Sequence, residues 1–252
     1  MNKKKMVIIG LFSLFFMVIF HKAQSVYALN LTDFGVNFNG EDPQATVDTV
    51  TVFILLTILT LVPSFIILTT CFTRVIVVLS FLRNAIGSQQ TPPNQVLMGI
   101  ALFITLFVMT PVYTQVMDEA VTPFVNGEIT QEEAFDIGAV PIKKFMLNQT
   151  REKDLALFMR AGNLENVDNP MELSMFVVIP AFTISELRLA FSIGFILFLP
   201  FLVTDIVVSS ILMSMGMFML PPAMISLPFK LLLFILVDGW YLVVESLLKG
   251  FS

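Results

Sequence analysis

Two side chains of opposite charge, Asp205 and Lys230, interrupt long apolar runs near the end of the sequence. An ionised side chain in the hydrocarbon of a membrane costs about 2.5–3.5 kcal/mol even on insertion scales, so neither group is expected to face lipid. A chain that folds back near residues 217–218 places both groups at the same height on two neighbouring helices. We therefore predict that Asp205 and Lys230 form an ion pair.

The same fold-back point would bring together two outer pairs, Glu186 with Lys249 and Arg188 with Glu245. Few charges are available in this region, and the sequence leaves the helical phase open. Chance alignment is therefore the competing interpretation of all three pairs.

Residues 213–222, here called the methionine loop, join the two charged arms and carry no charge. Gly216, Pro221 and Pro222 disfavour a continuous helix, so we expect the tip of a hairpin. Methionine is unbranched and polarizable, and a cluster of it can close around irregular or changing surfaces. The alternative is that these are ordinary apolar residues at membrane depth. The large apolar side chains of the tip are Met213, Met215, Met217, Phe218 and Met219.

The composition is that of a membrane protein, with 26 Phe and 15 Met among 252 residues and 13% charged residues. The only cysteine is Cys71, which excludes an intrachain disulfide and a cysteine-built metal site. A single histidine, His21, and the lack of a Gly-Lys-Ser/Thr phosphate loop argue against catalysis and ATP hydrolysis. The net charge of −5 argues against a nucleic-acid partner. We expect no cofactor and no metal.

The N-terminus has the pattern of a secretory signal peptide. Three lysines precede the apolar run 6–20, which is too short to cross a membrane comfortably. Residues 26–28 then fit a signal-peptidase site, so we predict cleavage after Ala28 and removal of residues 1–28. A retained anchor helix is the alternative. Cleavage would leave the polar segment 29–48 outside the cytoplasm.

Four long apolar segments predict an all-α, membrane-associated fold. We expect a first helical hairpin over residues 49–117 and a second over residues 185–252. Arg74 and Arg83 lie in a connection without acids, which indicates the cytoplasmic side.

The intervening segment, residues 118–184, is acidic, and we expect it to be helical and extracytoplasmic. Residues 118–188 hold twelve acids and six bases. Helix-start signals occur at Thr130 with Glu133, Thr183 with Glu186, Pro141 and Pro170, and a helix-end signal occurs at Gly162.

The second hairpin is poorly suited to lipid, because prolines and charges interrupt both arms. Such helices pack better against protein, so we infer an oligomer whose methionine loops point inward. The interruptions are Pro200, Asp205, Pro228, Lys230, Asp238 and Glu245.

Four motifs closely resemble the FliP family of flagellar biosynthesis proteins, and the resemblance covers about residues 48–248. They are SFLRNA (80–85), TPPNQVLMGIALFITLFVMTP (91–111), LPPAMISLPFKL (220–231) and VDGW (237–240). Homologues in virulence type III secretion share these motifs and are the alternative. The signal sequence favours the flagellar branch.

The resemblance implies a core subunit of the type III export gate in the bacterial inner (cell) membrane, within the flagellar basal body. Several copies, expected to be a pentamer, would assemble with FliQ and FliR into a helical oligomeric channel. FlhA and FlhB would be further partners, and unfolded rod, hook and filament subunits the substrates. The family's methionine-rich loop constricts the closed pore and corresponds here to Met217, Phe218 and Met219. Phe218 departs from the family's usual methionine.

Two other classes of function are weaker. A solute or ion transporter could use Asp205 and Lys230 as coupling groups, but the inverted repeats typical of such proteins are not seen. An intramembrane enzyme lacks the residues that it would need.

Overall fold

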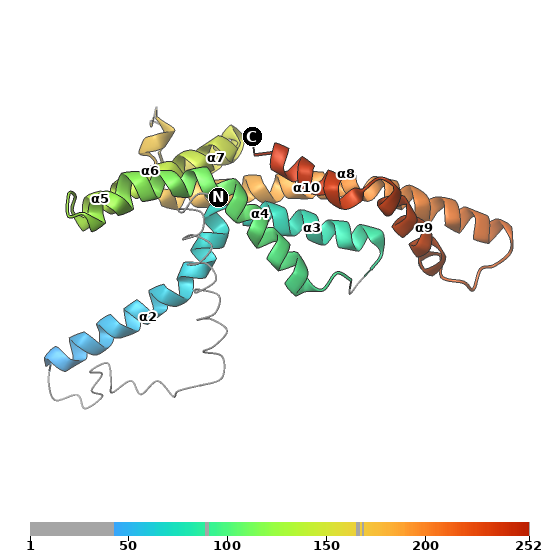
Figure 1. The fold of residues 1–252 in the computed structure, drawn as a ribbon, viewed down its shortest axis with the longest axis horizontal. Helices are drawn as coiled ribbons and strands as arrows, with labels where there is room; N and C mark the ends of the chain where they lie inside the picture. Colours follow the sequence, from blue (N-terminus) through green and yellow to red (C-terminus); the bar gives the residue numbers. More distant parts are fainter. Residues whose placement is uncertain (1–42, 89–90, 165–166, 168, 252) are drawn as a thin grey trace, which may run out of the picture. The chain divides into compact units, whose positions relative to one another are not determined.

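The computed structural model describes residues 43–88, 91–164, 167 and 169–251, and every regular element in these ranges is a helix (Figure 1). The predicted all-α fold class is confirmed. The signal peptide 1–28 with its cleavage site at Ala28, and the segment 29–42, lie outside the described residues. The chain divides into two units, residues 1–62 and 63–252, which are described separately.

The described part of the first unit is the first portion of helix α2 (Pro43–Thr69). The window Val52–Thr69 of this helix is long and apolar enough to cross a membrane. Its threonines do not disturb that character, because Thr57 and Thr60 donate their hydroxyls to carbonyls one turn earlier in the helix.

The second unit is built from helices joined by short turns (Figure 1). Helix α4 continues directly into a π-helical turn, η2, and then into α5. The elements are α3 (Phe72–Ile86), α4 (Asn94–Val116), η2 (Met117–Val121), α5 (Thr122–Val125), α6 (Gln131–Gln149), α7 (Glu152–Ala161), the 3₁₀ turn η3 (Pro170–Glu172), α8 (Met175–Ser214), α9 (Pro222–Leu236) and α10 (Gly239–Lys249).

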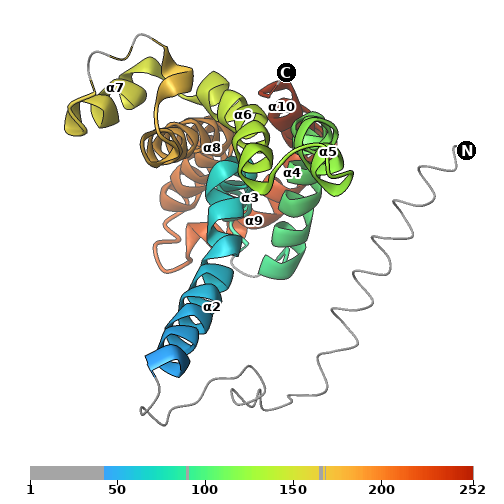
Figure 2. The ribbon, with the colours of Figure 1, turned by 90° about the vertical axis from the view of Figure 1, so that its left-hand side faces the viewer.

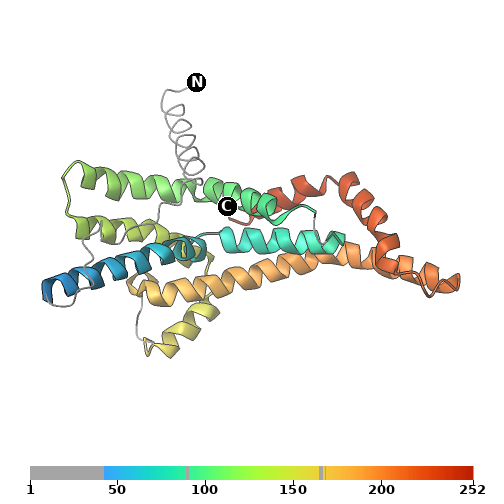
Figure 3. The same cartoon turned by 90° about the horizontal axis from the view of Figure 1, so that it is seen from below.

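Helix α8 is the element on which this unit is assembled, because α3, α6, α7 and α9 all pack against it (Figures 2 and 3). Its 40 residues give a length of about 60 Å, twice the roughly 30 Å of a bilayer's hydrocarbon. The helix is therefore longer than an upright crossing of a bilayer requires. The helix also runs without interruption through residues 184–185, where the sequence suggested the start of the second hairpin.

The larger core surrounds helix α3, which packs against α4, α8 and α9. The sequence analysis placed Arg74 and Arg83 in a connection between apolar segments, and this was wrong because both lie in helix α3, where apolar residues recur every three or four positions. Gly194 of α8 allows the close approach, since a Cβ atom at this position would lie 2.6 Å from Cγ of Phe81. The buried α3 side chains are Val75, Val78, Leu79, Leu82, Ala85 and Ile86.

A smaller core joins the acidic segment to the start of α8 through Met146, Leu173, Val178 and Phe182. The segment is helical, as predicted.

Its local signals have mixed outcomes. Thr130 and Glu133 form the predicted capping box of α6, Gly162 ends α7, and Pro170 begins η3. The cap predicted at Thr183 was wrong, because this residue lies inside α8 and donates its hydroxyl to the Ile179 carbonyl oxygen at 2.8 Å. Pro141 lies in the interior of α6 rather than its first turn.

Within the described residues, three helices and one bent helix pair correspond to the four apolar segments. The windows are Val52–Thr69, Asn94–Val125 and Met175–Ser214, together with α9 and α10, which meet at 61°. The break lies at Asp238, whose φ of 50° interrupts the helical backbone.

Candidate functional site

The methionine loop forms the turn between α8 and α9, at the end of residues 63–252 opposite the α5–α6 turn (Figures 1 and 3). Helix α8 ends at Ser214, and Gly216 has a φ of 75° that other residues rarely adopt. Pro222 then begins α9 in the first turn, where a missing N–H costs nothing. The predicted hairpin tip therefore results from the loop's own residues, Gly216 and Pro222, rather than from distant contacts.

The side chains of the loop are exposed in the single chain. Met219 is 97% exposed and Phe218 is 78% exposed, and Met213, Met215 and Met217 also reach solvent. No ionisable residue occurs between Asp205 and Lys230 in the sequence. The tip is therefore an exposed, largely apolar surface without an ionisable side chain.

Asp205 and Lys230 form an ion pair near the base of this hairpin. The Lys230 ammonium lies 2.6 Å from Oδ2 of Asp205 and also donates to the Ala85 carbonyl oxygen at 3.3 Å. Ser226, which is fully buried, donates its hydroxyl to Oδ1 of Asp205 at 2.6 Å. The cluster thus joins α8 and α9 to the end of α3.

The partners in this cluster fit one another electrostatically. Both oxygens of Asp205 accept a hydrogen bond, which satisfies the main requirement for a carboxylate among apolar neighbours. Ala85 lies in the last turn of α3, where carbonyl groups lack helical partners and a cation is favourable. The Lys230 side chain is 6% exposed, whereas that of Asp205 is 31% exposed, so the carboxylate retains access to its surroundings.

An apolar groove with a volume of about 620 Å³ lies between α8 and α9, along the stretches that carry Asp205 and Lys230. It is lined by Pro200, Val203, Thr204, Val207, Val208, Ile211, Leu212, Ile225, Phe229 and Leu233.

The two outer pairs predicted from the fold-back point are not formed among the described residues. Lys249 pairs with Glu245 one turn earlier at 2.8 Å, and Arg188 is exposed. Glu186 pairs with Arg74 instead. The physical reason is the bend between α9 and α10, because equal distances from the loop no longer mean equal heights beyond Asp238.

Arg74 lies at the centre of a buried polar network that sequence reasoning missed. Its guanidinium binds both carboxylate oxygens of Glu186, with Nε donating to Oε2 at 2.8 Å. It also donates to the Gln149 side chain at 2.9 Å and to the Gly250 carbonyl oxygen at 3.0 Å, and its Cζ lies 3.9 Å from the centre of the Phe251 ring. This network ties α3, α6, α8 and the C-terminal residues together. The apolar spacing that follows Arg74 was the signal that could have identified α3.

A metal centre is not supported in the described ranges, since they contain no group of three His, Cys, Asp or Glu side chains that could hold an ion.

The fold and the site together define a class: an all-helical protein with helices long and apolar enough to cross a membrane and a charge-free methionine hairpin. The FliP family matches residues 55–247 of this chain. The chain belongs to the FliP family.

Proteins named flagellar biosynthetic protein FliP are similar over most of their length. The one from Bacillus subtilis is 51% identical over 85% of this chain and 97% of the relative. The one from Pectobacterium carotovorum is 54% identical over 79% of this chain and 77% of the relative. The one from Borreliella burgdorferi is 42% identical over 95% of this chain and 97% of the relative.

Proposed function

We propose that this chain is a membrane-embedded subunit of the flagellar type III export gate, and that its methionine loop closes the pore. The observation that carries the proposal is the exposed, charge-free tip formed by Met217, Phe218 and Met219 on a hairpin braced by an ion pair. No chemical step is assigned to the chain. Its role is to separate two compartments and to yield when an unfolded protein passes.

Apolar exclusion is the physical basis of the seal. Side chains of several copies that converge on one axis would exclude water and ions from the constriction. Methionine suits such a constriction because its flexible thioether conforms to any passing side chain without requiring hydrogen bonds. Phe218 is stiffer, but its large ring can still fill the passage.

The charge cluster would hold the two arms of each loop in register. Asp205 and Ser226 link α8 to α9, and Lys230 links both to the end of α3. A loop supported in this way can move as a unit with its hairpin. It would not change its own conformation around each substrate.

The proposal includes an oligomer, for which a pentamer with FliQ and FliR is the expected form. Exposed loops need partners, and the apolar groove of about 620 Å³ between α8 and α9 offers a surface for a neighbouring copy. FlhA, FlhB and the basal body would be further partners, and unfolded flagellar subunits the cargo. The surrounding membrane would be the bacterial inner membrane, with the N-terminus and residues 118–184 outside the cytoplasm.

The test is a double substitution, Met217→Ala with Met219→Ala, in cells that assemble the complete complex. We expect increased permeability to small ions and polar solutes, because a narrower side chain leaves a hydrated path. The control is Met98→Ala, which shortens an exposed methionine on α4 far along the sequence from the loop. Unchanged permeability in an assembled complex of the double variant would contradict the sealing role.

A further inference from the structure

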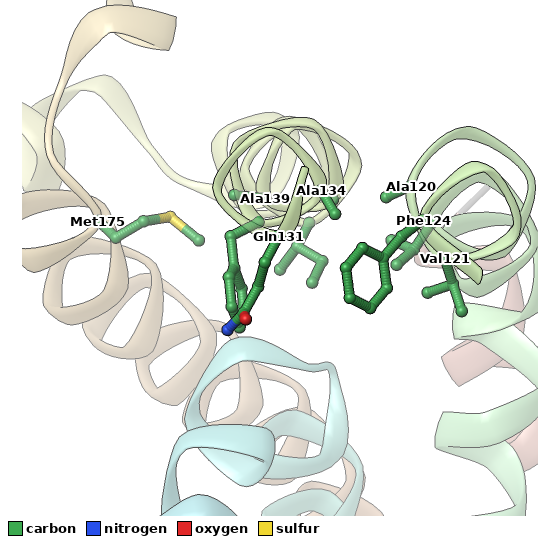
Figure 4. A pocket seen from close by; sticks show the side chains of 11 residues that line it. Ala120, Val121, Phe124, Gln131, Ala134, Ala139 and Met175 are labelled. Atoms are coloured by element: carbon green, nitrogen blue, oxygen red, sulfur yellow. The ribbon is translucent and has the colours of Figure 1, made fainter. Parts of the chain in front are cut away.

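An open apolar groove lies in the acidic part of the chain, away from the methionine loop. Its volume is about 660 Å³. One wall is η2 and α5, with Ala120, Val121 and Phe124, and the other is α6, with Ala134 and Ala139 (Figure 4). Phe135 of α6 also lines the groove. Phe124 reaches from α5 toward the space beside α6 (Figure 4).

The two walls approach each other closely at the bottom of the groove, where their side chains are small. A Cβ atom added at Gly138 would lie 3.3 Å from the Cβ of Ala120, so the helices touch there with no bulky residue between them. Larger apolar groups stand at the edges: Phe135 is 70% exposed. The groove therefore has a shallow floor and apolar sides.

Acids predominate along both walls, and the first basic residues of α6, Lys143 and Lys144, follow directly after its last lining residue, Ile142. Residues 117–142 contain Asp118, Glu119, Glu128, Glu132, Glu133 and Asp136, all exposed, and neither lysine nor arginine. Glu119 and Glu132 directly adjoin the lining residues Ala120 and Gln131. Placing this many ionised side chains in hydrocarbon would be costly. We therefore infer that the groove faces water rather than lipid acyl chains.

We propose that this groove binds an amphipathic helix of another protein, one that presents apolar residues on one face and lysine or arginine beside them. An apolar groove exposed to water favours a partner that buries it, and the surrounding acids favour a cationic one. The lining stretch of α6, from Gln131 to Ile142, is about 16 Å long. It accommodates about three helical turns, with anchors at positions i, i+3 or i+4, and i+7. This inference is independent of the sealing role of the methionine loop.

The binding test uses two synthetic helices and the full chain in nanodiscs of zwitterionic lipid. One labelled peptide carries leucines at the anchor positions and lysines elsewhere, and the second has glutamate in place of each lysine. Fluorescence anisotropy is expected to show binding of the lysine peptide alone, weakening as salt rises. Empty nanodiscs report and correct for binding to lipid.

Charge reversal locates the interaction. The double variant Glu119→Lys with Glu132→Lys is expected to weaken binding of the lysine peptide by about tenfold or more. The double variant Glu152→Lys with Glu172→Lys makes the same change in net charge on exposed residues outside the groove, and is expected to change binding little. Equal weakening by both variants would mean a general charge effect and would overturn the proposal.

Filling the groove gives a second, independent measurement. Ala139→Trp places a large ring among the lining residues and is expected to abolish binding, whereas Val140→Trp, on the adjacent exposed position of α6, is expected to preserve it. Thermal unfolding of both variants checks that they are folded. Equal binding of the two peptides, or failure of the wild-type chain to bind because a second copy or another segment covers the groove, would overturn the proposal.

Discussion

Helix α8 carries two carboxylates that bind cations from other helices, and their surroundings differ in a way that bears on their roles. Glu186 and Arg74 are each only 1% exposed, and the guanidinium has further partners on α6 and beyond α10. Asp205 and Lys230 lie near the methionine loop, with the carboxylate 31% exposed. The first pair is enclosed on all sides, and the second has one open side.

The difference indicates which connection is fixed and which can rearrange. Separating Arg74 from Glu186 would leave two charges buried without solvent, so this network should stay intact in every state of the protein. Separating Asp205 from Lys230 would let the carboxylate reach water or another donor, while the ammonium keeps the Ala85 carbonyl. The part of α8 near the loop is therefore the part that can rearrange.

The largest effect is expected from Glu186→Ala, which leaves the Arg74 guanidinium buried without its counter-charge. Breaking such a pair costs about 3–5 kcal/mol, so the variant should unfold at a clearly lower temperature or fail to accumulate. The control is Glu245→Ala, which removes a pair within one helix whose cation, Lys249, is exposed, and it should cost less than about 0.5 kcal/mol. Similar thermal unfolding of the two variants would contradict the distinction between the pairs.

An intermediate effect is expected from Asp205→Ala, at about 2 kcal/mol, because the site is partly open and Lys230 keeps one acceptor. The charge-swapped variant, Asp205→Lys with Lys230→Asp, should recover part of the export lost by either single reversal. Full recovery is not expected, because an aspartate at position 230 would face the Ala85 carbonyl. If the swap exports no better than either single reversal, the ion pair has no role of its own.

The sequence predicted those features that depend on a few neighbouring residues. The helical class, the hairpin tip between Ser214 and Pro222 and the cap of α6 are all of this kind. Apart from the Asp205–Lys230 pair, features set by contacts between distant residues were missed. Arg74 was assigned to a connection between helices, because the sequence does not show that Glu186 and Gln149 lie on the helices that surround it. The two outer ion pairs were predicted wrongly because the chain bends at Asp238. This bend is a change of backbone conformation at one residue, which the sequence pattern did not reveal.

A third carboxylate extends the comparison to the acidic segment. Asp154 accepts hydrogen bonds from the Ser185 hydroxyl at 2.6 Å and from Arg151 at 2.5 Å, which links α7 to the residue before Glu186. Desolvation acts to raise its pKa, but the donation by Ser185 and Arg151 outweighs it, so the pKa of Asp154 lies below its ordinary value of 3.8.

The pH dependence follows from the sign of that shift. A carboxyl group with a lowered pKa in the folded state stabilises the fold above its unfolded pKa, and this contribution is lost as the pH falls through the folded pKa. We expect thermal unfolding of the wild type to decline more steeply than that of Asp154→Asn between about pH 6 and about pH 3. Parallel declines would mean that the carboxylate is not linked to folding.

The smallest effect is expected for Thr130 and Glu133, which are exposed and cap α6. Here the same sequence pattern occurs twice, at Thr130 with Glu133 and at Thr183 with Glu186, and only the first forms a cap. Thr130→Ala should cost about 1 kcal/mol, because it leaves the backbone N–H of Glu133 without its hydroxyl acceptor. Thr183→Ala should cost less, because that hydroxyl bonds a carbonyl already paired within α8. Amide hydrogen exchange at the start of α6 distinguishes the two: faster exchange in Thr183→Ala than in Thr130→Ala would mean that tertiary contacts, and not the cap, hold that helix end.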